Sequence, residues 1–365
     1  MKISLNQKEQ YKLKQLFAIK ENNVQVSLML SYLLENIDLY NKDVISSYQK
    51  EYSCSLNEAY FHYAIDIWEL DYENRDNQII FNNYLRSCFK ESNEKDYKEN
   101  PYYKNVKINE VKKNNYHLFY DQYKAYEPFP LNDIQIKENY IEQTTFSFFK
   151  TDFKFACLNL NNTTWMSITP NEINTMKNSI EKANGNVLVL GLGLGYFPYM
   201  ISLKSNVKTI DIVEKDKQIV DIFKNHIYPF FNMKNKFKVV NEDAFSYLNN
   251  IKNNYDFVFV DLYHNPVDAL PIYIRCKKIE NQNIAHFDYW LEEGILAYLR
   301  RLVITVMEES WEGKKDKDYQ NSYSEEDKII NEIYFKTKEL DFKDFNQIIT
   351  YLKNDSLKKL VKSLF

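Results

Sequence analysis

The chain has 365 residues, 44% of them hydrophobic and 16% aromatic, so it is long enough for two or three domains with packed cores. Its 47 basic and 51 acidic residues give a formal net charge of -4 without a long basic stripe, which excludes nucleic acid as the default partner. The four cysteines are far apart and form no C-x-x-C pair, which argues against structural zinc or any other metal and against a disulfide framework.

Residues 1–130 are predicted to form a helical N-terminal domain. The N-terminus lacks the apolar core of a signal peptide, and the most apolar early run, residues 24–34, is too short and too polar to span a bilayer. We therefore expect a cytoplasmic protein without a membrane partner. Ser55 and Glu58 form a capping-box motif before apolar residues at helical spacing. Residues 90–115 are charged and Asn-rich, and we interpret them as a connecting loop.

Residues 131–168 are predicted to contain a small β-hairpin. Threonine and phenylalanine, which favour strands, recur between residues 144 and 158. The pair Asn161-Asn162 is a credible turn before Trp165.

A helix is predicted to follow the hairpin. Thr169 is a good N-cap, Pro170 suits the first helical position, and Glu172 stands where a capping glutamate is found. The helix should run from Pro170 to about residue 183 and open the next domain, residues 169–310.

Residues 169–310 alternate apolar segments with amphipathic helical stretches. This alternation predicts parallel strands with right-handed helical crossovers, hence a doubly wound Rossmann-like α/β domain. Ligands bind such sheets at the carboxyl ends of the strands. Residues 311–365 look like a mainly helical C-terminal extension in which 345–352 is the only strand-like run. The predicted strands are residues 187–190, 207–213, 237–240 and 257–260.

Three of the six glycines in the chain lie in one turn, at Gly191, Gly193 and Gly195. The turn stands between the first predicted strand and a helix predicted over residues 196–203. Glycine is needed there because the backbone turns sharply and must come close to a ligand beside helix N-terminal amides. The alternative is a tight turn without a ligand.

Two carboxylates follow the next two strands. Glu214 comes about 20 residues after the glycine turn, where a carboxylate can accept the hydroxyl hydrogens of an adenosine ribose. Glu214 could instead be a solvated charge, and neighbouring Asp216 could take its role. Asp243 could accept a hydrogen bond from an adenine amino group, with Ala244 beside it and Phe245 flanking the ring. Asp243 could equally be only the N-cap of the following helix.

Candidate catalytic residues follow the fourth strand, at Asp261, Tyr263 and His264. Asp261 or His264 could orient or deprotonate an acceptor amine or hydroxyl. The alternatives are that Asp261 merely caps the following turn and that His264 is exposed.

Four motifs, VLVLGLGLGY, DIVEKD, NEDAF and YDFVFVD, resemble the ordered motifs of class I S-adenosylmethionine methyltransferases, and more closely the spermidine-synthase-like branch of that fold. The resemblance covers residues 165–309 and implies S-adenosyl-L-methionine as the cofactor. It places the three glycines beside the methionine part, Glu214 at the ribose, Asp243 and Ala244 at the adenine, and Asp261 at the reacting amine.

The chain departs from the spermidine synthases at two places. Those enzymes usually carry an Asp inside the glycine turn, where this chain has Leu194. They also carry a D-S-S-D-P-like stretch where this chain reads DLYHNP from Asp261. The loss of these acids weakens the case for a polycationic amine substrate.

The first functional hypothesis is a methyltransferase acting on a small molecule or a protein side chain, because methyl transfer depends mainly on alignment and desolvation. Aminopropyl transfer to a polyamine is an alternative. A third is a non-catalytic nucleotide-fold module whose N-terminal region binds a partner. A nicotinamide dehydrogenase is disfavoured because Tyr196 stands where its motif needs a small residue. The chain is also a possible homodimer.

Overall fold

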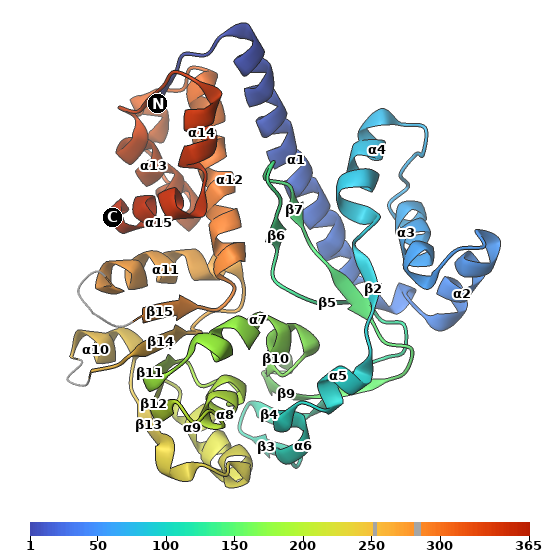
Figure 1. Cartoon of the computed structure of the whole chain (residues 1–365), viewed down its shortest axis with the longest axis vertical. Helices are drawn as coiled ribbons and strands as arrows, with labels where there is room; N and C mark the ends of the chain where they lie inside the picture. Colours follow the sequence, from blue (N-terminus) through green and yellow to red (C-terminus); the bar gives the residue numbers. More distant parts are fainter. Residues whose placement is uncertain (251–253, 281–285) are drawn as a thin grey trace.

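The computed structural model describes residues 1–250, 254–280 and 286–365. Its central sheet has five parallel strands in the order β13-β12-β11-β14-β15 (Figure 1). The prediction of a doubly wound Rossmann-like sheet is confirmed, and all four predicted strands are present. The strands are β11 (Gly185–Leu190), β12 (Val207–Glu214), β13 (Phe237–Asn241), β14 (Phe257–Val260) and β15 (His286–Tyr289).

Strand β11 lies at the centre of the sheet and pairs with both β12 and β14. Its residues from Val187 to Leu190 are fully buried, because helices cover both faces of a parallel sheet and such strands are apolar throughout. The fifth strand, β15, was not predicted because its sequence, HFDY, is short and half polar. The helices between and after the strands are α7 (Pro170–Lys182), α8 (Tyr196–Ser202), α9 (Lys217–Ile222), α10 (Ala244–Asn249), α11 (Pro266–Glu280) and α12 (Glu292–Trp311).

The N-terminal region begins with helices, as predicted. The capping box at the start of α3 is present: the backbone N–H of Glu58 donates to the Ser55 hydroxyl, and the N–H of Ser55 donates to the Glu58 carboxylate at 2.9 Å. Figure 1 shows α2, α3 and α4 grouped on the far side of the long helix α1 from the C-terminal helices. The helices are α1 (Gln7–Glu35), α2 (Lys42–Glu51), α3 (Leu56–Ile67), α4 (Arg75–Ile80), α5 (Glu94–Lys98) and α6 (Pro101–Asn105).

A four-stranded antiparallel sheet, β10-β9-β4-β3, precedes the Rossmann-like domain. The predicted hairpin is confirmed as β9 (Phe153–Leu160) and β10 (Thr163–Ser167), with Asn161 and Asn162 at φ values of 53° and 66°. Such angles at both turn residues fit a two-residue hairpin. The other two strands are β3 (Val111–Lys113) and β4 (Tyr116–Tyr123).

Those two strands correct the sequence-based boundaries. The helical prediction for residues 1–130 is wrong from residue 111 onward, because β4 pairs along its whole length with β9. The loop prediction for residues 90–115 is also wrong, since the segment holds α5, α6 and β3. Short strands complete this region: β2 (Phe89–Glu91), β5 (Phe129–Pro130), β6 (Gln135–Ile136), β7 (Glu142–Gln143) and β8 (Phe146–Phe148).

The C-terminal extension is helical, as predicted, and its strand-like run is a helix. Asp344 caps α14 (Phe345–Tyr351), which lies between α13 (Glu325–Thr337) and α15 (Asn354–Ser363). The first strand, β1 (Lys2–Ile3), pairs in parallel with β16 (Asp341–Phe342), so the N-terminus of the chain is joined to the C-terminal extension.

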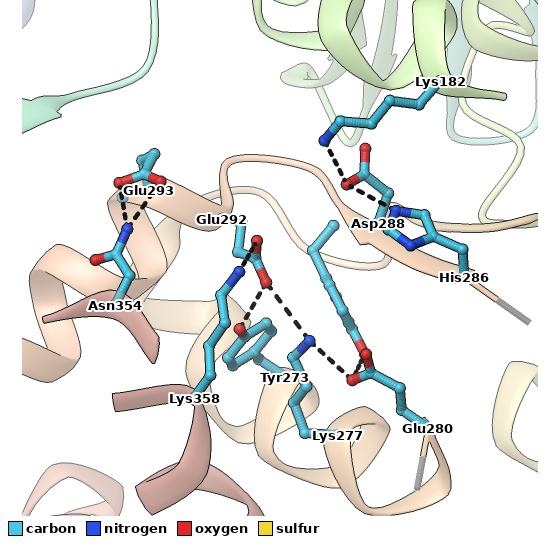
Figure 2. A network of polar contacts seen from close by, with 12 residues as sticks. Lys182, Tyr273, Lys277, Glu280, His286, Asp288, Glu292, Glu293, Asn354 and Lys358 are labelled. Atoms are coloured by element: carbon cyan, nitrogen blue, oxygen red, sulfur yellow. Dashed lines mark hydrogen bonds and ion pairs between the residues drawn. The ribbon is translucent and has the colours of Figure 1, made fainter. Parts of the chain in front are cut away.

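The extension is fastened to the Rossmann-like domain by a polar network (Figure 2). Glu292, at the start of α12, accepts hydrogen bonds of 2.7 Å from Tyr273 of α11 and from Lys358 of α15. Lys277 lies 3.6 Å from the same carboxylate and 2.8 Å from Glu280. Among the described helices, we find none long and apolar enough to cross a membrane.

Candidate active site

A cavity of about 410 Å³ opens at the carboxyl ends of β11, β12 and β14. This volume lies within the range of about 300–1,000 Å³ that is typical of small-molecule sites. The glycine turn and the last residues of the strands form one side, and the hairpin strand β10 contributes Trp165 and Met166. Every predicted site residue lines the cavity except Gly195: Gly191, Gly193, Glu214, Asp243, Ala244, Asp261, Tyr263 and His264.

The three glycines of the turn have different tasks. All have positive φ angles, 96° at Gly191, 53° at Gly193 and 75° at Gly195, which non-glycine residues adopt at a cost. A Cβ at Gly191 would lie 1.9 Å from the carbonyl oxygen of Asp261, and one at Gly195 would lie 2.6 Å from the Phe223 ring. Gly195 therefore permits packing and does not face the ligand cavity, which corrects its predicted role. A Cβ at Gly193 would meet no atom within 4 Å, so its main chain is open to a ligand.

Glu214 ends β12 and is held against the glycine turn. Its carboxylate accepts hydrogen bonds from the backbone N–H of Leu192 at 3.2 Å and of Asp216 at 2.8 Å. The residue is 8% exposed, and this burial raises the pKa of its carboxyl, although the two N–H donors act in the opposite direction. Glu214 is therefore an oriented, buried carboxylate at the place where the sequence predicts a ribose partner.

Both carboxylate oxygens of Asp216, the alternative ribose partner, already accept hydrogen bonds within the protein. One of its oxygens accepts from the N–H groups of Gln218 and Ile219 and so caps α9, and the other accepts from the Tyr116 hydroxyl of β4 at 2.5 Å. This leaves Glu214 as the better candidate.

Asp243 is the N-cap of α10, one of its two predicted roles. Its Oδ1 accepts from the N–H of Phe245 at 3.1 Å and of Ser246 at 2.9 Å, and these bonds lower the pKa of the carboxyl. Asp243 also lines the cavity with Ala244 and Phe245. The Phe245 ring is covered on one face by the guanidinium of Arg275, 3.6 Å from the ring centroid. Asp243 therefore both caps α10 and lines the cavity, and its carboxyl is also hydrogen-bonded with the Ser246 side chain.

Asp261 lies at the floor of the cavity, directly after β14. Its backbone N–H donates to the carbonyl of Leu190 at 2.9 Å, which fixes it beside the glycine turn. Burial raises the pKa of its carboxyl from 3.8 to about 7, with a further contribution from the charge of Glu214. A group with this pKa can accept or release a proton near neutral pH.

Glu172 is a site residue that the sequence reasoning missed. Its sequence position predicts a capping residue, but Glu172 lines the cavity, and only the Thr169 hydroxyl caps α7, at 3.5 Å from the Glu172 N–H. Burial and then the charge of Asp261 raise the pKa of Glu172 well above its usual value. The hint in the sequence was its position just after the hairpin, which brings the first turn of α7 over the strand ends.

Tyr263 is buried and its hydroxyl is already hydrogen-bonded, whereas His264 is exposed. The Tyr263 hydroxyl donates to the carbonyl of Trp290 at 2.5 Å, and the residue is buried. The predicted catalytic role of Tyr263 is therefore replaced by a positioning one, because its hydroxyl is bonded to the main chain. His264 is exposed, as one alternative held, and stands edge-on to Trp165 of β10, with the ring centroids 4.3 Å apart. It lies at the mouth of the cavity and not at its floor.

Helix α6 supports the glycine turn from outside. The Tyr102 hydroxyl donates to the carbonyl of Leu194 at 2.6 Å. Asn100 and Asn105 donate to the hydroxyls of Tyr196 and Tyr199 on α8, at 3.0 and 2.9 Å. These contacts join residues more than 90 positions apart, and no sequence pattern indicates them.

The residues around the cavity fit a nucleoside linked to a positively charged group. Main chain is accessible at Gly193, a carboxylate is available at Glu214, and the aromatic ring of Phe245 lies beside them. Five acidic residues line the cavity beside one lysine, Lys215, and this acidic lining favours a cationic ligand: Glu172, Glu214, Asp216, Asp243 and Asp261. Within the described part of the chain no cluster of side chains suited to a metal ion was found.

Residues 168–273 match the family model of the spermine/spermidine synthase domain, which confirms the resemblance drawn from the four sequence motifs. No curated protein sequence matches the chain. Among solved structures, spermidine synthase from Thermotoga maritima is similar with a TM-score of 0.29 and 13% identity, over 41% of this chain and 59% of that one. Human methyltransferase-like protein 13 in complex with SAH is similar with a TM-score of 0.20 and 22% identity, over 26% of this chain and 44% of that one.

Proposed function

We propose, from the spermine/spermidine synthase-like domain over residues 168–273, that this protein transfers a methyl group from S-adenosylmethionine to an acceptor amine. The observation that carries the proposal is the cavity itself: an open main chain at Gly193, an oriented carboxylate at Glu214, and Asp261 with a pKa of about 7 meet around one volume. A bound donor of this type would supply an activated carbon on a sulfonium.

The residues of the chain would act mainly by placement. Glu214 would hold the ribose, the main chain around Gly193 would follow the methionine part, and Asp243 would lie at the adenine. Asp261 and Glu172 would hold the acceptor nitrogen in line with the sulfonium. Alignment of this kind supplies much of the acceleration in a displacement that needs no covalent help.

The proton balance assigns a task to Asp261. An alkyl amine is protonated near neutral pH and has no free lone pair in that form, so it must lose one proton before it can attack. The C–S bond breaks as the N–C bond forms, the electron pair of the C–S bond stays on sulfur, and the amine proton passes to the Asp261 carboxylate. This requires Asp261 to be ionised, which a pKa of about 7 permits at neutral pH.

Aminopropyl transfer is the second candidate, and Glu172 favours it. A second carboxylate beside Asp261 suits an acceptor with more than one amine. Against this candidate stands Leu194, an apolar and buried residue at the place where the spermidine synthases usually carry an acid in the turn. Methyl transfer therefore remains the first candidate function.

The test combines donor binding with product analysis. S-adenosylmethionine and S-adenosylhomocysteine are expected to raise the melting temperature, and the Glu214→Ala variant should lose this effect. The protein is then incubated with S-adenosylmethionine or its decarboxylated form and a set of mono- and diamines, and products are identified by mass spectrometry. A methylated amine supports the first candidate and an aminopropylated amine the second. The absence of any donor effect on melting at millimolar concentration would overturn both.

A further inference from the structure

A second cavity lies next to the first and shares Ile168 with it. Its volume is about 310 Å³, and it is enclosed by α6, the segment that follows α6, and one face of the β4-β9 pair. Ile168 lines both cavities, and its carbonyl accepts a hydrogen bond from the Tyr103 hydroxyl at 2.5 Å. The cavity is a distinct volume that the proposed transferase reaction does not use.

The floor of this second cavity is apolar and buried. Tyr102 and Ile168 are 2% exposed, and the remaining floor residues are Val106, Ile108 and Ala156. The Tyr102 ring is fixed by edge-on contacts with Tyr196 and Tyr199 and by the bond from its hydroxyl to Leu194. A pre-formed floor of rings and aliphatic side chains suits a flat apolar group.

The rim of the cavity is basic. Lys107 and Lys154 line it and are exposed, and Lys107 is held at the mouth by a 2.7 Å hydrogen bond to the Tyr103 carbonyl. Lys154 stands on the same sheet face as Ala156 and Tyr120, which are opposite each other in the β4-β9 register. Neither lysine has an ion-pair partner among the residues that the structure describes, and no carboxylate lines this cavity.

The two cavities therefore differ in the sign of their charge. The first is lined by five acidic residues and one lysine, and the second combines a buried apolar floor with two lysines that have no ion-pair partner among the described residues. An ammonium group pairs best with a carboxylate or another compact anion. A ligand for the second cavity must then be flat and apolar at one end and anionic at the other.

We propose that this cavity is a second binding site, for a small planar aromatic carboxylate. The ring lies on the floor formed by Tyr102, Ile108 and Ala156, with Tyr120 at its edge. The carboxylate lies between Lys107 and Lys154. The site is independent of the donor cavity, although Ile168 and Tyr102 connect its wall to the glycine turn.

The test uses 1-naphthoate as the probe and isothermal titration calorimetry of the full chain. Saturable binding is expected, with 1-naphthalenemethanol, which has the same ring but no charge, binding about tenfold more weakly or less. The double variant Lys107→Gln with Lys154→Gln should lose about tenfold in affinity for 1-naphthoate. Lys208→Gln, at an exposed lysine on β12, is the matched control and should leave the affinity unchanged.

Three results would overturn the proposal. No binding of 1-naphthoate at millimolar concentration removes the site, and equal affinity for the alcohol or for the double variant removes the charge recognition. Loss of binding when S-adenosylhomocysteine saturates the donor cavity would place the probe there instead. If the protein binds no adenosylmethionine-type donor, the naphthoate titration still decides this proposal, so the two failures are distinguishable.

Discussion

The backbone N–H of Leu192 donates to the carboxylate of Glu214 at 3.2 Å, so the glycine turn after one strand is bonded to the last residue of the next strand. The residue that would hold the sugar is thus oriented by the loop that would hold the rest of the donor. Loss of the Glu214 side chain should affect both.

The first prediction concerns Glu214. In Glu214→Ala, the affinity for S-adenosylhomocysteine should fall by about 10–100-fold, because a charged hydrogen bond to a buried hydroxyl contributes about 1.5–3 kcal/mol. Calorimetric titration measures the change. Glu242→Gln, at a half-buried glutamate that directly follows the neighbouring strand β13 and does not line the cavity, should bind like the wild type. Equal losses in both variants would contradict the assigned role.

The second prediction separates two glycines of the turn. Gly193→Ala should fold and lose only about 1–2 kcal/mol of stability, because its φ of 53° strains an alanine but its Cβ meets no atom. Its donor affinity should fall, since the new methyl group enters the open part of the turn. Gly191→Ala should lose more than about 3 kcal/mol, because its Cβ would lie 1.9 Å from a backbone oxygen. Chemical denaturation and donor titration measure the two effects, and similar stability of both variants would contradict this division.

The third prediction concerns the pH dependence of stability. The Asp261 carboxyl has a folded-state pKa of about 7 against 3.8 in a model peptide, so the folded chain binds this proton more tightly than the unfolded chain. The free energy of unfolding should therefore fall as pH rises from about 4 to about 7, by up to about 4 kcal/mol. Asp261→Asn removes this loss and should be more stable than the wild type at pH 8. Urea unfolding of both proteins at pH 5 and pH 8 tests this prediction. If the difference in free energy of unfolding between Asp261→Asn and the wild type does not grow with pH, the burial argument is refuted.

The fourth prediction concerns the acceptor side. Glu172→Gln should raise the KM for a diamine acceptor by about tenfold while the affinity for S-adenosylhomocysteine stays within about twofold, because Glu172 lines the cavity and the charge that raises its pKa is that of Asp261, the proposed acceptor-side residue. Glu181→Gln on the exposed face of the same helix is the control. A loss of donor affinity in Glu172→Gln, with the diamine KM unchanged, would move Glu172 to the donor side.

The sheet and most of the cavity were predictable from the sequence, and the reason is local. Buried parallel strands such as β11 are apolar throughout, and a cluster of glycines directly after a strand marks a close approach of main chain to a ligand. The motifs therefore located Gly191, Gly193, Glu214 and Asp261 correctly around one volume.

What the sequence did not indicate depends on tertiary contacts. Glu172 occupies a position that reads as a helix cap, and only the placement of α7 over the strand ends turns its side chain into the cavity. Strand β4 was not predicted because its sequence mixes polar and aromatic residues, and the residues it pairs with on β9 lie 30 to 44 positions further along the chain. The hydroxyl of Tyr263 donates its hydrogen bond to the carbonyl of Trp290, 27 residues further along the chain, and so is not free to contact a ligand.

The three bonds that α6 makes to the glycine turn and to α8 have a consequence for anyone who divides this protein into parts. A fragment that starts at the hairpin would keep every residue of the matched domain but would leave the carbonyl of Leu194 and two tyrosine hydroxyls of α8 without their donors. The ligand-facing loop is thus shaped partly by a helix encoded upstream of the recognisable motifs. Sequence motifs alone would set the boundary of the functional unit too late in the chain.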